Sequence, residues 1–93
     1  MVLRVSPVLF SVLTPLGFSV RTTEAYWGFV ERNHPEVRGK IDIVKRSLEA
    51  PYMIRRSKQD RSVYLFYAHM PPYHLVVVAK RLDGEGFIKE GEL

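Results

Sequence analysis

Alternating apolar and polar positions at the start of the chain predict two extended segments. The run from Val8 to Leu13 is rich in β-branched and large apolar residues, and residues 18–22 alternate Phe18 and Val20 with polar neighbours. This period of two is typical of strands. Between the two runs, residues 14–17 contain Pro and Gly, which favour turns. We therefore expect a hairpin or a bent strand to open the chain.

The pattern then changes to the spacing of amphipathic helices. A first helix is predicted to begin after the N-cap candidates Thr22 and Thr23 and to run to about Asn33, because Pro35 disfavours helical geometry in the residue before it. Its apolar positions recur three and four residues apart, at Tyr26, Phe29 and Val30. A second helix carries its apolar stripe at Ile41, Val44 and Leu48 and is stopped by Pro51.

The remaining chain has the signature of strands and tight turns. Extended segments are predicted at 52–54, 61–68, 75–78 and 86–88, with turns at 57–60, 70–72 and 83–84. Helices followed by consecutive hairpins indicate the α+β class. We predict two N-terminal helices packed on one face of an antiparallel sheet of about four strands, in a single domain spanning residues 1–93.

Length and composition narrow the class of protein. A chain of 93 residues is too short for a second folded domain or a barrel enzyme, and the absence of Cys excludes disulfides and thiolate sites. The apolar stretch after Arg4 is similar to an export signal, but Pro7 and Pro15 interrupt it and no small-residue cleavage site follows. No apolar run approaches the roughly 20 residues that span a bilayer. A cytoplasmic protein with no membrane partner is expected.

Positive charge is the first indication of a ligand. Fourteen Lys and Arg against ten Asp and Glu give a net charge of +4, which suits an anionic partner such as nucleic acid. Several cations lie at predicted strand ends, which can converge in an antiparallel sheet: Arg21, Arg55, Arg56, Lys58, Arg61, Lys80 and Arg81. Such a cluster can hold a phosphate. The alternative is a charged rim that protects an edge strand from aggregation.

Histidine and aromatic residues offer further chemistry. His34, at a predicted helix end, suits a general acid or base, and its alternative role is to cap the helix. His69 and His74 flank the turn at 70–72 and are interpreted as surface loop residues, and the spacing of the three histidines does not predict a metal site. Aromatic residues in or next to the predicted strands can stack on unpaired bases or pack in the core: Tyr64, Phe66, Tyr67 and Tyr73.

A set of spaced motifs resembles a known family of nucleases. The motifs are Pro15-Leu16-Gly17-Phe18, Arg21-Thr22-Thr23, Tyr26-Trp27, His34-Pro35, Ser47-Leu48-Glu49-Ala50-Pro51, Ile54-Arg55-Arg56-Ser57, Leu65-Phe66-Tyr67, Val76-Val77-Val78 and Leu82-Asp83-Gly84-Glu85-Gly86-Phe87. Together they cover about residues 15–92, after an extended N-terminal segment at 1–14. They resemble the small phage and bacterial nucleases grouped as barnase, EndoU, colicin-type and RelE-like (BECR) ribonucleases.

The resemblance implies RNA cleavage by 2′-hydroxyl attack without a metal or other cofactor, often by the toxin of a toxin–antitoxin pair. His34 would be the acid or base, and Ser57 and Tyr67 would position the phosphate or relay a proton. Arg56 would neutralise the phosphate at the catalytic centre. The implied phosphate and RNA contacts are those of Arg21, Arg55, Lys80 and Arg81. The implied partners are RNA and an antitoxin protein.

The C-terminus departs from the family pattern. Gly86-Phe87-Ile88 runs directly into Lys89-Glu90-Gly91-Glu92, where relatives have about one more strand containing Thr-Ala-Tyr. A shortened last strand would leave an exposed sheet edge, which a second copy or an antitoxin can cover. Three alternatives remain open: an active ribonuclease, a degenerate relative that only binds RNA or protein, and a small structural or dimerisation module.

Overall fold

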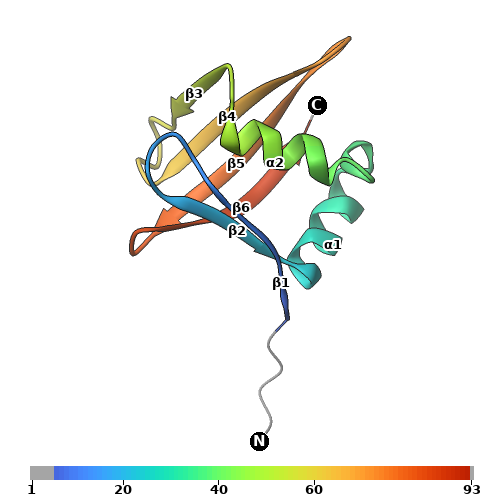
Figure 1. Cartoon of the computed structure of the whole chain (residues 1–93), viewed down its shortest axis with the longest axis horizontal. Coiled ribbons are helices and arrows are strands. Elements are labelled where there is room, and N and C mark those ends of the chain that lie inside the picture. Colours follow the sequence, from blue (N-terminus) through green and yellow to red (C-terminus); the bar gives the residue numbers. More distant parts are fainter. Residues whose placement is uncertain (1–5, 93) are drawn as a thin grey trace, which may run out of the picture.

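The computed structural model describes residues 6–92, which form one six-stranded sheet with two helices. Residues 1–5 of the predicted N-terminal segment, including Arg4 of the export-like pattern, lie outside the described residues. In chain order the elements are β1 (Val8–Leu13), β2 (Ser19–Thr23), α1 (Glu24–Asn33), the short 3₁₀-helix η1 (Pro35–Val37), α2 (Ile41–Glu49), β3 (Met53–Arg56), β4 (Val63–Met70), β5 (Tyr73–Leu82) and β6 (Glu85–Glu92) (Figure 1).

The individual helices follow their local signals. Thr23 caps α1, since its side-chain oxygen accepts a hydrogen bond from the backbone N–H of Tyr26 at 3.2 Å. The helix ends at Asn33, before Pro35, and α2 ends at Glu49, before Pro51. Both predicted helices are therefore confirmed in position. Within residues 6–92, neither has the length and apolar character needed to cross a bilayer.

The predicted architecture is wrong in the number and direction of its strands. The sheet order is β1-β2-β6-β5-β4-β3, and it is mixed, because β2 and β6 are parallel whereas the other neighbours are antiparallel. The N-terminal hairpin joins the main sheet, with Val20 opposite Gly86 and Arg21 opposite Phe87. The fold is thus dominated by a six-stranded sheet, not by two helices on a four-stranded antiparallel one.

The last strand is also longer than the sequence indicates. Residues 89–92 have low β-propensity, yet β6 continues to Glu92 because it pairs with Val76, Val77 and Val78 of β5. It lies between β2 and β5, so it is not an edge of the sheet. The expectation that a shortened last strand leaves an edge exposed is therefore wrong; the edges are β1 and β3.

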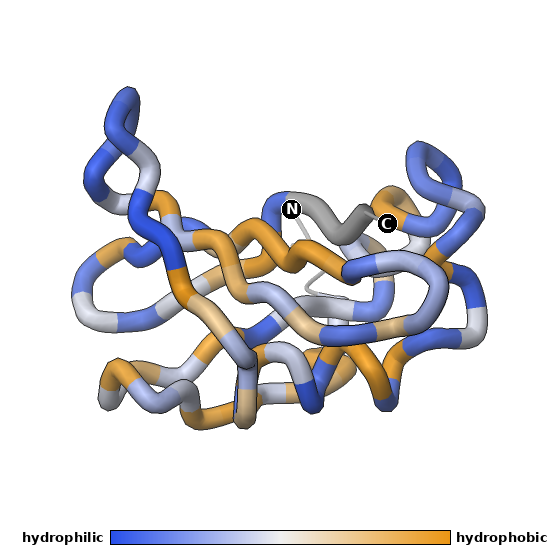
Figure 2. The backbone as a smooth tube through the Cα atoms, turned by 90° about the horizontal axis from the view of Figure 1, so that it is seen from above, coloured by the Kyte–Doolittle hydropathy of each residue, from blue (hydrophilic) through white to orange (hydrophobic). Residues whose placement is uncertain are grey.

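One face of the sheet is covered by the helices. α2 contacts β4 and β5, and α1 contacts β1, β2 and β6 (Figure 1). Hydrophobic segments run through the interior of the molecule (Figure 2), and every second residue of β4 and β5 turns to this face, where Phe66, Leu75 and Val77 are buried. The core includes the following buried side chains: Val20, Trp27, Val30, Val44, Leu48, Phe66, Leu75, Val77 and Ile88.

The face of the sheet opposite the helices is here called the open face, because the helices do not pack on it. By strand register it carries Arg21, Arg55, Leu65, Tyr67, Val76, Val78, Lys80 and Phe87. These side chains are half-buried or exposed. Val63 is a buried exception, at 8% exposed. The open face therefore combines apolar, aromatic and cationic groups that solvent can reach.

Candidate nucleic-acid interface

A cavity lies at the end of the open face where β2, β5 and β6 meet. Its volume is about 510 Å³, and its lining includes Arg21, Lys80 and Phe87 together with the apolar side chains of Val8 and Leu82. Lys80, Phe87 and Arg21 are cross-strand neighbours in one row of the sheet. Two of the predicted phosphate ligands therefore converge on one cavity, with an aromatic ring between them.

Arg21 is held over that ring. Its guanidinium carbon lies 4.8 Å from the centroid of Phe87, which is cation–π geometry. The same guanidinium forms an ion pair of 3.1 Å with Glu85. Because the guanidinium covers this face of the ring, a base stacks there when Arg21 moves off the ring, for example to a phosphate.

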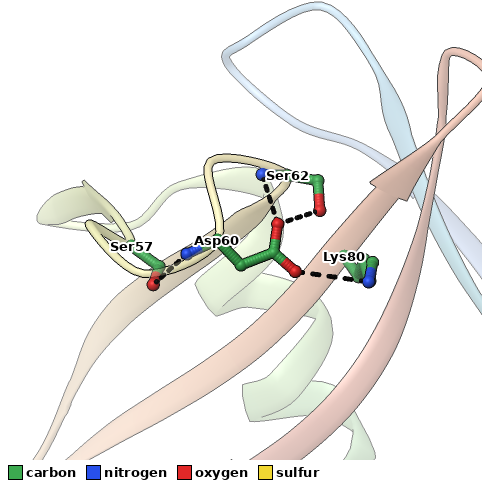
Figure 3. A network of polar contacts seen from close by, with 4 residues as sticks. All are labelled: Ser57, Asp60, Ser62 and Lys80. Carbon is green, nitrogen blue, oxygen red and sulfur yellow. Dashed lines mark hydrogen bonds and ion pairs between the residues drawn. The ribbon is translucent and has the colours of Figure 1, made fainter.

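Lys80 of β5 contacts a polar network that the turn between β3 and β4 forms (Figure 3). Its Nζ lies 3.2 Å from Oδ2 of Asp60. The other oxygen of Asp60 accepts hydrogen bonds from the Ser62 hydroxyl at 2.6 Å and the Ser62 backbone N–H at 3.0 Å. The Ser62 hydroxyl, the Ser62 N–H and then Lys80 lower the pKa of Asp60 from 3.8 to about 2. Asp60 is therefore a stable anion at neutral pH.

Ser57 is a structural member of the same turn. Its hydroxyl accepts a hydrogen bond from the backbone N–H of Asp60 at 3.3 Å, and its own N–H donates to the carbonyl of Val63 at 2.9 Å. These bonds fix the turn that presents Asp60 to Lys80. The catalytic role predicted for Ser57 has no support in these contacts.

The predicted basic cluster is divided between the two faces. Arg55 lies opposite Leu65 on the open face, whereas Arg56 lies opposite Tyr64 on the other face. Arg56 covers the Tyr64 ring at 5.1 Å and donates to the carbonyl of Arg61. Arg81 likewise lies on the helix-covered side, with its guanidinium 4.7 Å from the Phe18 ring. Arg21, Lys80 and Arg55 thus share the open face, and Arg56 and Arg81 do not.

His34 is far from the other predicted catalytic residues. It follows α1, where its backbone N–H donates to Val30 and its Nδ1 lies 3.4 Å from a carboxylate oxygen of Glu36. α1 contacts β1, β2 and β6, whereas Arg56 lies in β3 at the opposite edge of the sheet. Tyr67 is on the open face in the middle of β4. Among the described residues, the four predicted catalytic side chains therefore share no pocket.

No family model matches this chain, and no curated protein or solved structure is significantly similar to it. Function must therefore be inferred from the residues that the fold brings together.

A second group of side chains lies on the open face, and Tyr67 is the only one of them among the predicted site residues. His69 of β4 and His74 of β5 are cross-strand partners, so the prediction that both are loop residues is wrong. The Tyr52 ring stacks on His69, with centroids 4.0 Å apart and an interplanar angle of 14°. Its hydroxyl lies 2.9 Å from Nδ1 of His74. Tyr67 completes this histidine–tyrosine cluster, with its ring 6.1 Å from Tyr52.

The sequence does contain a signal for this cluster. Met70 pairs with Tyr73, so Pro71-Pro72 is a two-residue hairpin loop. Residues equidistant from such a loop are cross-strand neighbours, which places His69 opposite His74. The described part of the chain contains no group of three or more His, Asp or Glu side chains placed to hold a metal ion.

Proposed function

We propose that this protein binds single-stranded RNA across the open face of its sheet. The observation that carries the proposal is the row of Lys80, Phe87 and Arg21 along one cavity. A base can enter the apolar cavity and stack against Phe87, while its phosphates contact the two cations. Aromatic platforms flanked by positive charge are the usual means by which sheets bind single strands.

The carboxylates beside these cations do not prevent phosphate binding. Arg21 pairs with Glu85, and Lys80 pairs with Asp60, both at the surface. Exposed ion pairs contribute little to stability, so a phosphate can replace the carboxylate at little cost. Arg21 can also bind a phosphate through two parallel hydrogen bonds, which adds to the attraction of its charge.

Cleavage of the bound RNA is a second candidate function. The motifs that resemble the BECR ribonucleases favour it, and so does the pair of imidazoles on the same face as the cavity. In that case a toxin–antitoxin role would follow from the resemblance, and the sheet edges β1 and β3 are the surfaces on which an antitoxin or a second copy can add a strand.

Binding is tested by fluorescence anisotropy with a labelled single-stranded RNA at increasing salt. We expect affinity to fall as salt rises, and Arg21→Gln and Lys80→Gln each to reduce the slope of log K against log salt by about 0.7, the value for one lost single-strand phosphate contact. Phe87→Leu should weaken binding by about 1–3 kcal/mol through the loss of base stacking.

Arg38→Gln is the matched control. Arg38 is an exposed cation after η1, so its loss makes the same charge change away from the open face. It should leave the salt slope unchanged. The proposal is wrong if the wild-type protein does not bind at low salt, or if Arg38→Gln reduces the slope as much as the cavity variants do.

A further inference from the structure

We propose that His69 and His74 are the acid–base pair of an RNA cleavage site on the open face. The inference rests on the proposed RNA binding, and it replaces His34 as the catalytic histidine. The juxtaposition of the two imidazoles carries it. They are cross-strand partners with ring centroids 5.3 Å apart, and both side chains are exposed.

RNA cleavage by its own 2′-hydroxyl needs two proton transfers. A base takes the 2′-hydroxyl proton as the 2′-oxygen bonds to phosphorus, and an acid protonates the 5′-oxygen as the phosphorus–5′-oxygen bond breaks. The products are a 2′,3′-cyclic phosphate and a 5′-hydroxyl, and no co-reactant is consumed. Imidazole groups titrate near neutral pH, so a pair of them can supply one base and one acid.

Tyr52 acts as a positioning residue for this pair. A tyrosine hydroxyl can both donate and accept, so it can hold Nδ1 of His74 in either charge state of the ring. Nε2 of His74 then remains to exchange a proton with RNA. Because the Tyr52 ring also stacks on His69, one side chain fixes the orientation of both imidazoles.

The cluster and the cavity can be reached by one RNA strand. Along β5, His74 precedes Lys80 by six residues, which is about 20 Å in an extended strand. Arg55 lies on the open face between these two levels, opposite Leu65 and hence level with Val78. A strand anchored at the cavity by Lys80 and Arg21 would pass Arg55 on its way to the histidines. Sites of about four or more nucleotides are usual for folds that bind single strands.

The test separates cleavage from binding. The full-length protein is mixed in excess with a labelled single-stranded RNA in EDTA, and products are identified by gel and mass spectrometry in a single-turnover experiment. Binding is measured by anisotropy with the same RNA carrying 2′-deoxy nucleotides, which cannot be cut. We expect 2′,3′-cyclic phosphate products from the wild-type protein.

The variants assign the roles. His69→Gln and His74→Gln should each slow cleavage at least about 100-fold while binding is retained, because general acid–base catalysis contributes about 10²–10⁴ in rate. Tyr52→Phe keeps the stacked ring but loses the hydroxyl, so it should lower the single-turnover rate about tenfold without changing the dissociation constant. Tyr73→Phe removes a tyrosine hydroxyl at the hairpin tip outside the cluster and should change neither. Circular dichroism melts check that each variant is folded.

Three results would overturn the inference. Binding without cleavage by the wild-type protein would leave the proposed function standing and remove the catalytic site. Cleavage that survives in folded His69→Gln and His74→Gln but is lost in His34→Gln would return the role to His34. Absence of binding by the wild-type protein would remove the proposed function and this inference together.

Discussion

Asp60 and Lys80 form an ion pair that joins the turn before β4 to the central strand β5, with Oδ2 and Nζ 3.2 Å apart. Lys80 also lines the cavity, and Ser62 holds the Asp60 carboxylate in place by two hydrogen bonds. One anionic residue therefore supports the turn and also competes with any phosphate for the cation. Both effects can be measured separately.

The first prediction concerns stability at acid pH. The folded-state pKa of Asp60 is lowered to about 2, below the value of about 3.9 for an unfolded chain. A lowered folded-state pKa contributes stability above the unfolded value, and this contribution is lost as pH falls from about 4 to about 2. In urea titrations, Asp60→Asn should therefore be less stable than the wild type at pH 5, and the two should converge toward pH 2.

Ser62→Ala provides the internal check on that prediction. The Ser62 hydroxyl is the largest cause of the lowered pKa, so its removal should raise the pKa of Asp60 and move the loss of stability to higher pH. Carbon-13 NMR of the Asp60 carboxyl group follows this titration directly. A stability difference between wild type and Asp60→Asn that stays constant from pH 5 to pH 2 would contradict the prediction.

The second prediction concerns RNA affinity. Asp60→Asn releases Lys80 for phosphate, so binding of single-stranded RNA at low salt should tighten by roughly two- to fivefold, the energy scale of one surface ion pair. Glu49→Gln makes the same charge change at the exposed end of α2, away from the open face, and should have a smaller effect. Anisotropy titrations with both variants measure the difference. An equal gain in RNA affinity for Asp60→Asn and Glu49→Gln would contradict the prediction, because net charge alone would then explain it.

Local signals in the sequence predict the elements of this fold but not their arrangement. The cap at Thr23 and the stops at Pro35 and Pro51 act within a few residues, and they place both helices. The parallel pairing of β2 with β6 depends instead on Val20 meeting Gly86, two residues far apart in the chain. The last residues of β6 are strand because β5 supplies hydrogen bonds, and their own composition does not indicate this.

The candidate site, like the fold, can be predicted from the sequence only in part. Reasoning from strand ends brought Arg21 and Lys80 together, as the cavity shows. It fails for Arg56, since neighbours in a strand point to opposite faces and only Arg55 of the two lies on the open face. The histidine–tyrosine cluster is not predicted, because the sequence indicates a three-residue turn at 70–72. The loop contains only Pro71-Pro72, and this shorter loop is what pairs His69 with His74.

A third prediction uses the neighbouring threonines at the end of β2. The Thr22 hydroxyl is buried and has no hydrogen-bond partner among the described residues, whereas the Thr23 hydroxyl caps α1. Thr22→Val removes an unsatisfied polar group without changing the shape of the side chain, and should raise the free energy of unfolding by about 1 kcal/mol. Thr23→Val should lower it by about the same amount through loss of the cap. Urea unfolding followed by circular dichroism gives both values, and a destabilised Thr22→Val would reveal a hidden partner such as a buried water.

The fourth prediction tests the parallel pairing of β2 with β6. A Cβ at Gly86 would lie 2.7 Å from Cγ2 of Val20 and 3.0 Å from Cε2 of Phe18, and both side chains are buried. Gly86→Ala should therefore destabilise the protein by about 1–3 kcal/mol through overpacking. Gly28→Ala is the matched control, because its Cβ would lie 3.5 Å from the flexible end of Arg32 inside α1, where Ala is favoured over Gly by up to about 1 kcal/mol.

The double variant Gly86→Ala/Val20→Ala shows whether the Val20 contact is the cause. Val20→Ala removes the methyl group that the new Cβ would meet, so the double variant should be more stable than the sum of the two single losses predicts. Additive losses would mean that the contact with Phe18, rather than Val20, sets the cost. A neutral Gly86→Ala would contradict the close pairing of β2 with β6, and with it the row of Lys80, Phe87 and Arg21 that this pairing creates.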